Sequence, residues 1–401
     1  MPAREASDLF SLYQWLHEHP ELSGCEVETS ARIAAELREA GFDVTTGVGG
    51  AGLVGVLANG SGPTLLVRTD MDALPLAERT GVPWASRRAG VMHACGHDMH
   101  MTVFIGAARA LAGMRREWRG TLVMVGQPAE ETGSGARAML ADGLFTRFPR
   151  PDFNLALHVD PALEAGRAGY REGYVFASSD FIDVTIRGAG GHAAYPHLTR
   201  DPIVIAAEFV MALQTIVSRE IRPLDPAVVT VGSIHGGSKH NIIPDEVTMQ
   251  LTSRSYDPAV RGLILASVRR MARGIALAAG VPEECLPVVA VAEGSAHSTY
   301  NSPDLARRIV PVWRRELGAA NVVERDPEMG FEDFSEYGMV EPRIPGFLFR
   351  LGAAAPERVE EARRGGKPLP GLHSSEFLPD SPPTIATGVK AMATAALELL
   401  R

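Results

Sequence analysis

The 401-residue sequence predicts an α/β fold with a largely parallel sheet, interrupted by a second layer of β-α-β-β-α-β order. Two observations support this prediction. In the first third of the chain, short apolar runs alternate with helical segments at the spacing of strand–helix–strand units. From about Ser179, apolar and polar residues alternate instead, as in a strand with one face in water.

Four apolar runs bounded by polar turns predict buried strands in the first third: LVGVLANG, TLLVRTD, TLVMVGQ and NLALHV. Before them, TSARIAAELREAGF predicts a helix that ends at Gly41, a typical C-terminal glycine. Between the second and third runs, MTVFIGAARALAG predicts a helix over 101–113. This order indicates an α/β unit on a largely parallel sheet.

Residues able to do chemistry stand at the ends of three of these runs. Asp70 and Asp72 follow the second run, Glu130 and Glu131 follow the third, and His158 closes the fourth. In parallel sheets, ligands bind beyond the carboxyl ends of the strands. The sequence therefore predicts a ligand site at this edge.

The later alternating segment predicts an inserted second domain over 179–293. The strand DFIDVTIRG comes first, and a helix follows with Asp201 as N-cap and Pro202 at its first position. The strands VVTVGSI and EVTMQLTSRSY, a helix over 258–279 and the strand LPVVAVAE complete a ferredoxin-like β-α-β-β-α-β order.

Helix and strand patterns resume after this insert, and the last candidate for chemistry, His373, lies there. The main domain is therefore predicted to be discontinuous and to comprise residues 1–178 and 294–401.

Composition excludes several classes of protein. Lys and Arg total 39 and Asp and Glu total 48, so the formal charge is −9 and nucleic-acid binding is not expected. Cys25, Cys95 and Cys285 cannot all pair, which indicates a reducing compartment. The N-terminal segment resembles an amphipathic helix, not an export signal, and no apolar run approaches the roughly 20 residues of a membrane span. We therefore expect a cytoplasmic protein that does not bind membranes.

The strongest local signal is the segment His93–His100, HACGHDMH. It holds three of the 12 histidines of the chain, together with Cys95 and Asp98. Cys95 and His97 flank one glycine and can turn toward one point, and thiolate and imidazole are ligands that Zn²⁺ and its divalent neighbours prefer. An isolated pair of this kind more often belongs to a His-rich loop with a buried Cys. The acids and the histidine at the strand ends favour a metal site.

The acids have two interpretations each. Glu130 and Glu131 stand on a turn, where one can bind a metal while the other faces metal-bound water as a base; two adjacent glutamates are more commonly just solvated. Asp72 can orient a ligand imidazole from outside the metal's own ligand set, or cap the following turn. We favour the metal-related role for all three because apolar strands deliver them to one edge.

Eight motifs resemble, in order, those of the M20 metallopeptidase superfamily: RTDMDALP, MHACGHDMH, GQPAEETGSGA, ALHVDP, GGHAAYPH, HNIIPD, GFEDFSEY and GLHSSEF. They are most similar to its amidohydrolase branch, which holds hippurate hydrolases, N-acyl-amino-acid deacylases and indole-acetyl-amino-acid hydrolases. The resemblance runs from His19 to about Leu378. It implies a catalytic domain with two divalent metal ions (Zn, Mn, Co or Ni) and an insert that serves as lid and forms a homodimer or a dimer-based oligomer.

The resemblance also implies roles for residues of the main domain. Glu130 is implied as general base and proton shuttle, with Asp72 supporting the metal ligands. Cys95 is implied to bridge the two metals. The implied metal ligands are Cys95, His97, Glu131, His158 and His373.

Three residues of the insert resemble substrate-binding positions of this family. His192, in GGHAAYPH, is implied to polarise the scissile carbonyl, often across into the partner subunit's site. Asn241, in HNIIPD, matches a substrate-binding Asn. Arg254, in QLTSRSY, matches an Arg for the substrate carboxylate, a task that suits the guanidinium fork. Without the resemblance, His192 reads as a turn residue and Arg254 as a surface residue.

The sequence thus predicts hydrolysis of the amide bond of an N-acyl amino acid or a small peptide-like substrate. Glu130 takes a proton as metal-bound hydroxide attacks the amide carbonyl. The metals and His192 stabilise the oxyanion that forms there. A dipeptidase or aminopeptidase on the same metal centre is one alternative, and a non-catalytic dimer that binds an acylated metabolite is another.

Two further patterns are set aside. Gly47–Gly52 fits the dinucleotide pattern GxGxxG, but it leads into a strand where the fingerprint needs a helix, so we interpret it as a hairpin turn. Cys95 and His97 as a thiol nucleophile and its base would leave Glu130 and Glu131 without a task.

Overall fold

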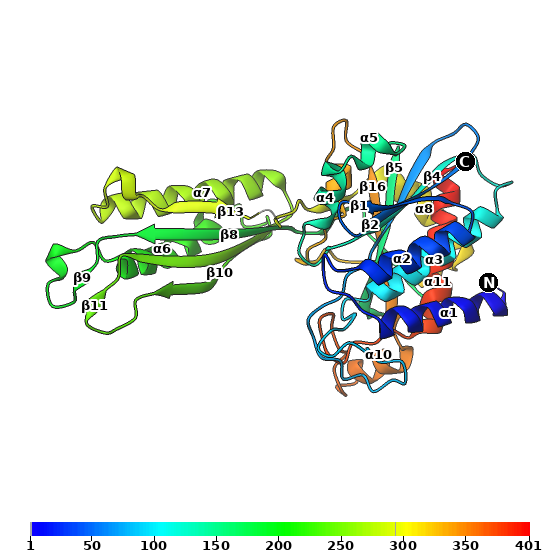
Figure 1. Ribbon diagram of the computed structural model, residues 1–401, viewed down its shortest axis with the longest axis horizontal. Coiled ribbons are helices and arrows are strands. Elements are labelled where there is room, and N and C mark those ends of the chain that lie inside the picture. Colours follow the sequence, from blue (N-terminus) through cyan, green and yellow to red (C-terminus); the bar gives the residue numbers. More distant parts are fainter. Residues whose placement is uncertain (1, 293) are drawn as a thin grey trace. The chain divides into compact units, whose positions relative to one another are not determined.

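The computed structural model describes residues 2–292 and 294–401 (Figure 1). The chain divides into two compact units. The first comprises Met1–Val175, Thr299–Pro327 and Asp333–Arg401, and the second comprises Phe176–Ser298 and Glu328–Glu332. Residue 293, where the predicted insert ends, lies outside the described residues.

The first unit is built on a mixed sheet whose central strands are parallel, as predicted. The strand order is β1-β2-β4-β3-β5-β16-β14-β7, with β6 beside β16 and β15 beside β6. Strands β4, β3, β5 and β16 run parallel, whereas β1 and β2 form an antiparallel hairpin next to β4. The strands are β1 Asp43–Val48, β2 Gly52–Asn59, β3 Thr64–Asp70, β4 Gly120–Gln127, β5 Phe153–Glu164, β6 Ala168–Tyr170, β7 Gly173–Phe176, β14 Thr299–Asn301, β15 Val322–Glu324 and β16 Gly346–Ala354.

The four apolar runs form β2, β3, β4 and β5, but the edges of the prediction differ from the structure. Strand β1 was not predicted, because most of its side chains are exposed or half-buried. Strand β5 continues beyond His158 to Glu164, where β16 still pairs with it, so His158 lies within a strand.

The hairpin turn predicted at Gly47–Gly52 is confirmed and joins β1 to β2. Gly49 has φ +65°, and a Cβ there would lie 2.5 Å from the backbone nitrogen of Met139. Only glycine fits such a close approach of two backbone segments.

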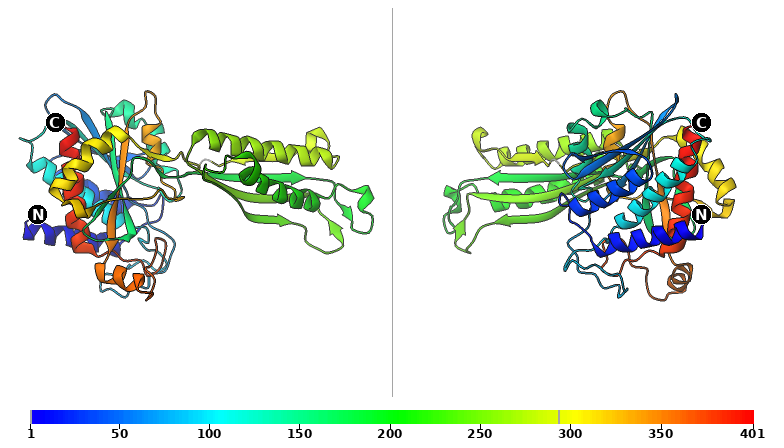
Figure 2. Two further views of the ribbon diagram at one scale, coloured as in Figure 1. Left: turned by 180° about the vertical axis from the view of Figure 1, so that it is seen from behind. Right: turned by 45° about the vertical axis from the view of Figure 1, so that its right-hand side comes forward.

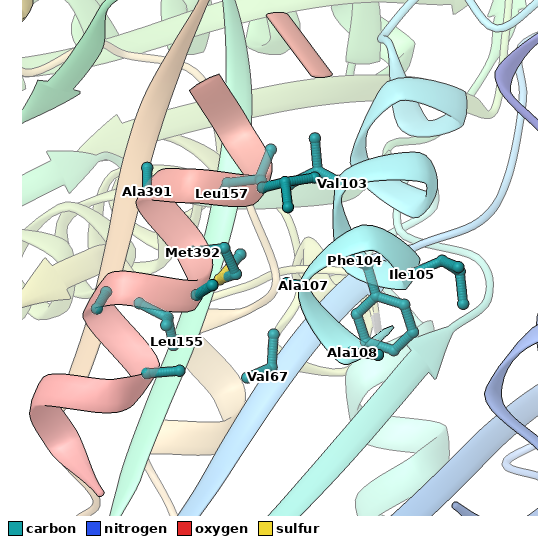
Figure 3. Packing of buried hydrophobic residues seen from close by; sticks show 14 of the residues in the cluster. Val67, Val103, Phe104, Ile105, Ala107, Ala108, Leu155, Leu157, Ala391 and Met392 are labelled. Atoms are coloured by element: carbon teal, nitrogen blue, oxygen red, sulfur yellow. The ribbon is translucent and has the colours of Figure 1, made fainter. Parts of the chain in front are cut away.

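Helix α3 is the central helix of the first unit and contacts α1, α2 and α11 (Figure 1). In the core, Met392 of α11 lies near Ala107 of α3 above the strands (Figure 3). The helices are α1 Ala3–Glu18, α2 Val27–Glu39, α3 His97–Gly113, α4 Gly135–Ala141, α5 Leu144–Arg147, α8 Pro303–Glu316, α9 Ser335–Gly338, α10 Pro356–Arg363 and α11 Ser381–Leu399.

The second unit is a four-stranded antiparallel sheet of order β10-β12-β8-β13. Helices α6 and α7 lie side by side against it (Figure 1, Figure 2) and bury the alternating apolar residues of β8 and β12. Asp201 caps α6 by accepting from the backbone N–H of Ile203, as predicted. The elements are β8 Ser178–Arg187, β9 Gly191–His192, α6 Pro202–Thr215, β10 Ala227–Gly236, β11 Ile242–Ile243, β12 Glu246–Ser255, α7 Pro258–Ala278 and β13 Val288–Val291.

One segment of the second unit is more apolar than a surface helix usually is. Pro202–Glu220 is long and apolar enough to cross a membrane by length and composition. Its residues Ile205, Phe209 and Leu213 are instead buried in the core of the second unit. One face of the segment therefore belongs to this core, while Val204 and Met211 on it are exposed.

A buried ionic contact ties α1 to the first turn of α3. Nδ1 of His17 lies 2.6 Å from Oδ2 of Asp98, and its Nε2 lies 3.1 Å from Oε1 of Glu78. Burial alone would lower the pKa of His17, but the hydrogen bonds to Asp98 and Glu78 raise the pKa to about 10. The imidazolium is thus the form that holds these two carboxylates.

We predict that His17→Ala lowers the free energy of unfolding by about 3–5 kcal/mol near pH 6, because two buried carboxylates lose their partner. The folded pKa of about 10 exceeds the unfolded value near 6.5, so the contribution of His17 is complete below about pH 6.5 and declines as the pH rises toward 10. The difference in unfolding free energy between wild type and His17→Ala should therefore be smaller at pH 9.5 than at pH 6. Urea unfolding at the two pH values measures it, with His235→Ala, at an exposed position, as control. An equal loss at both pH values would contradict it.

Candidate metal centre

The segment that carries Cys95 and His97 is shaped by Gly96, which directly precedes α3. Gly96 has φ +83°, and a Cβ there would lie 2.6 Å from Cγ2 of Val159. The left-handed glycine therefore lets the loop approach β5 next to His158 and start α3 at His97. This brings Cys95, His97 and His158 together.

The five predicted metal ligands form two groups that share Cys95. Cys95, His97 and His158 have ligand atoms within 4.8 Å of one another, and so do Cys95, Glu131 and His373. Sγ of Cys95 lies 3.5 Å from Nε2 of His158. Nε2 of His373 lies 3.5 Å from Oε1 of Glu131. Cys95 is thus common to both groups.

Most of these groups are buried at the carboxyl edge of the parallel strands. His97 is fully buried, His158 and Glu130 are 4% exposed, and Cys95 is 7% exposed. The side chain of His373, in contrast, is 55% exposed. The cluster is therefore closed on the side of the sheet and open at His373.

Asp72 orients His97. Nδ1 of His97 lies 2.8 Å from the backbone oxygen of Asp72 and 3.3 Å from its Oδ1. Asp72 is itself held, because its Oδ2 accepts from the hydroxyl of Ser23 at 2.6 Å and from the backbone N–H of Glu131 at 3.0 Å. Nδ1 of His97 is thereby held by Asp72, and Nε2, on the other side of the ring, faces the cluster.

The electrostatics of the cluster favour a cation. Burial raises the pKa of the Cys95 thiol well above its ordinary value, and the carboxylates of Glu131 and Glu130 raise it further. Burial alone would lower the pKa of His97, but Asp70 and Asp72 raise it to about 10. Negative charge thus exceeds positive charge around His97.

The residues fit divalent metal ions. Nε2 of His97 and Oε1 of Glu131 are buried and make no hydrogen bond within 2–292 and 294–401, and the nearest ring nitrogen to Oε1, Nε2 of His373, lies 3.5 Å away. Buried polar atoms are normally satisfied, so two such atoms that face one cluster need another partner. A thiolate, three imidazoles and a carboxylate form a donor set for Zn²⁺ and similar borderline metals.

His100 and Asp70 lie beside the cluster and were not among the predicted site residues. Nδ1 of His100 lies 2.7 Å from Oδ1 of Asp70, and its Nε2 accepts from the backbone N–H of Val159 at 2.9 Å. Both ring nitrogens of His100 are therefore used within the protein. The sequence shows His100 three residues after His97 and gave it no role; these contacts explain why it is not available as a ligand.

Asp70 lies at the centre of a second buried network. The guanidinium of Arg68, which is 1% exposed, contacts Asp70 at 2.8 Å and Asp333 at 3.1 Å, and its Nε donates to Gln127. Gln127 also accepts from the hydroxyl of Tyr337. The motif GFEDFSEY thus contributes Asp333 and Tyr337 to the support of the strand ends, a role that its residues alone did not reveal.

His192 and Asn241 lie beside each other in the second unit. His192 ends β9, and Asn241 directly precedes β11, the antiparallel partner of β9. The backbone N–H of Ala193 donates to the oxygen of Asn241 at 3.2 Å. Nδ1 of the exposed His192 accepts from the backbone N–H of Ala194 at 3.1 Å. In a neutral imidazole the proton is then on Nε2, which is free to donate.

Arg254 lies near the C-terminal end of β12, whereas β11 directly precedes the N-terminal end of this strand. Its register partner in β8 is Ser179, whereas Glu246, next to β11, pairs with Arg187. Eight residues of strand separate Arg254 from Glu246, which is roughly 26 Å. The second unit therefore does not bring Arg254 to His192 and Asn241. Nη1 of Arg254 is buried and has no hydrogen-bond partner in the part of the chain that the structure describes.

Comparison with known proteins gives a consistent result. Residues 66–362 match the model of peptidase family M20/M25/M40. The chain is 38% identical to the Arabidopsis thaliana IAA-amino acid hydrolase ILR1-like 2, over 84% of this chain and 75% of that protein. It is 36% identical to thermostable carboxypeptidase 2 of Saccharolobus solfataricus, over 84% of each. The Bacillus subtilis YXEP protein, a dinuclear metal-binding peptidase of the M20 family, matches with TM-score 0.80 and 28% identity, over 100% of this chain and 99% of that one.

Since Cys95 belongs to both groups, we predict that Cys95→Ala weakens the binding of both metal ions by more than roughly 100-fold. Loss of a residue that only supports a metal ligand weakens metal binding by up to roughly 100-fold, so loss of a ligand itself should cost more. Elemental analysis after dialysis against metal-free buffer measures the bound metal. The free thiols Cys25 and Cys285 supply matched controls as Cys25→Ala and Cys285→Ala. Retention of two metals by Cys95→Ala would contradict a bridging thiolate.

Proposed function

Since this chain belongs to peptidase family M20/M25/M40, it is a metal-dependent hydrolase of amide bonds, and we propose that the cluster around His97 is its active site. Its substrates are N-acyl amino acids or small peptide-like molecules. The observation that carries the proposal is the pair of ligand groups that share Cys95, with Glu130 next to them.

In this proposal Cys95, His97, Glu131, His158 and His373 hold two divalent metal ions. The mixture of sulfur, nitrogen and oxygen donors suits Zn²⁺, Mn²⁺, Co²⁺ or Ni²⁺. When bound, such ions supply Lewis acidity, which lowers the pKa of water and polarises an amide carbonyl. Glu130 supplies proton transfer, and His192, Asn241 and Arg254 of the second unit contact the substrate.

Glu130 is the proposed general base. Its Oε2 lies 3.9 Å from Nε2 of His97, and its side chain is 5% exposed, so it stands beside the ligand groups in a nearly dry environment. It takes a proton from the attacking water and returns it to the leaving nitrogen. Asp72 holds the ring of His97 in place and transfers no proton in this proposal.

His192, Asn241 and Arg254 are the proposed substrate contacts. The Nε2–H of His192 can donate to the carbonyl oxygen as negative charge develops there. Burial lowers the pKa of Arg254, but the group remains charged, and its free Nη1 donor suits the α-carboxylate of an acyl amino acid. Asn241 adds amide hydrogen bonds next to His192.

The distance along β12 supports a dimer. One small substrate cannot span the roughly 26 Å of strand between Arg254 and the β9–β11 pair within one second unit. We therefore propose that this unit acts as lid and dimerisation domain and that His192 and Asn241 serve the site of the partner copy. Edge strand β10, with Val228 and Ile234 exposed, and Met211 of α6 offer apolar surface for such pairing.

The three free cysteines fit a reducing cytoplasm.

We predict that Glu130→Gln lowers kcat for N-acetyl amino acids by about 10²–10⁴, because proton transfer is lost while the metal ligands stay in place. The measurements are kcat, KM and metal content, with the exposed Glu117→Gln as control. Hydrolysis at the wild-type rate in Glu130→Gln would end the general-base proposal.

Arg254→Ala is expected to raise KM for N-acetyl and N-benzoyl amino acids by roughly tenfold to 100-fold, because a charged hydrogen bond to the carboxylate is lost. The corresponding amino-acid amides, which lack the carboxylate, serve as the internal control and should show little change. An equal effect on acids and amides would contradict the carboxylate contact.

The same assays decide between substrate classes. Turnover of N-acetyl and N-benzoyl amino acids by the wild-type enzyme above that of free dipeptides supports the proposal. A strong preference for free dipeptides would favour the dipeptidase or aminopeptidase alternative, and no turnover by the metal-loaded protein would favour a binding function.

A further inference from the structure

We propose that Glu26 is a positioning residue that holds Ala129 in a left-handed backbone conformation and thereby places Glu130 in the active site. The inference rests on the proposed function of Glu130 as general base. Glu26 lies in the segment HPELSGCEVET, to which neither the metal ligands nor the substrate contacts belong.

Ala129 has an unfavourable backbone conformation directly before Glu130. Its φ is +51°, and among the described residues only Ala129 and His373 combine a positive φ with a side chain. Left-handed φ brings Cβ close to the following carbonyl oxygen, so alanine adopts it only where surrounding contacts impose it. Both such residues lie at the metal centre, one as a proposed ligand and one next to the base.

Glu26 supplies a contact that imposes this conformation. Its Oε1 accepts from the backbone N–H of Ala129 at 2.7 Å, and the residue is 0% exposed. Oε2 is buried as well and has no hydrogen-bond partner in the described chain. Glu26 directly precedes α2 and accepts from Ser30 through its backbone oxygen, so the carboxylate stands on a fixed helix end.

The loop around Glu130 is fixed from outside at two alternate amides. Glu26 binds the N–H of Ala129, and Asp72 binds the N–H of Glu131. Two contacts lie within the loop: the oxygen of Ala129 accepts from Gly135 at 3.1 Å, and that of Glu130 accepts from Gly133 at 2.7 Å. Two buried carboxylates thus set the peptide units on either side of the base.

The consequence concerns kcat more than substrate binding. Without the acceptor at Ala129, the backbone can relax toward negative φ and displace the carboxylate of Glu130. The metal ligands of the other strands and the second-unit residues stay unchanged. A displacement of about 1 Å at a catalytic group lowers the rate by up to roughly 100-fold.

The test uses four variants of the full-length, metal-loaded enzyme. Glu26→Ala removes the acceptor, Glu26→Gln keeps an oxygen at Oε1, and Ala129→Gly removes the steric cost of positive φ. The fourth variant combines Glu26→Ala with Ala129→Gly. Glu28→Ala, which removes an exposed carboxylate from the same helix, is the matched control. The readouts are kcat, KM, bound metal and the thermal midpoint.

Glu26→Ala is expected to lower kcat by roughly tenfold to 100-fold, with KM within about twofold and both metals retained. Glu26→Gln should stay within about threefold of the wild type, and the double variant should recover most of the kcat lost in Glu26→Ala. If Glu26→Ala does not fold, Ala129→Val with Glu26 intact should show the same loss of kcat, because a branched side chain resists positive φ.

Two outcomes would overturn the proposal. In one, Glu26→Gln is as impaired as Glu26→Ala; in the other, the double variant shows no recovery although its metals are bound. The result for Glu130→Gln separates this proposal from the function itself. A normal rate in Glu130→Gln overturns the function, whereas a normal rate in Glu26→Ala with an impaired Glu130→Gln overturns only the positioning role.

Discussion

The constraint on which the structure depends is the concentration of buried acidic groups around His97. Asp70, Asp72 and Glu130 are at most 4% exposed, and an unpaired buried carboxylate is strongly unfavourable. Each acid that serves as support has its own partner: Arg68 and His100 contact Asp70, and the hydroxyl of Ser23 contacts Asp72. The negative charge left over by these contacts faces the donor atoms of the cluster, where bound metal ions balance it in the proposed enzyme.

The α/β core makes this concentration possible. Parallel strands β3, β4 and β5 deliver their following residues to one edge, and α3 begins there at His97. The next residue, Asp98, is neutralised by His17 of α1, so the N-terminal helix is part of the support. Long-range ionic contacts therefore connect the packing of the helices to the geometry of the site, and strain at Ala129 and His373 is concentrated where that geometry matters.

Local patterns were sufficient for most elements of the fold but not for their ends. The apolar runs of β2 to β5 and the cap of α6 depend on near neighbours in the chain, and these predictions were accurate. Strand β1 and the end of β5 were missed, because their residues are polar or include Pro161 and become strands only through pairing with β2 and β16. Pairing partners more than a few residues away leave no local pattern.

By itself the sequence determined which chemical groups are available: a thiol, a run of histidines and two adjacent glutamates at the ends of apolar strands. Only the tertiary structure decided how each is used. The sequence favoured His97 over His100 only by its place beside Cys95. In the structure, the contacts of His100 with Asp70 and Val159 occupy both its nitrogens, while Nε2 of His97 has no hydrogen-bond partner among the described residues. The physical reason is that a side chain's role depends on which of its polar atoms are already satisfied, and the partners come from segments far apart in the chain.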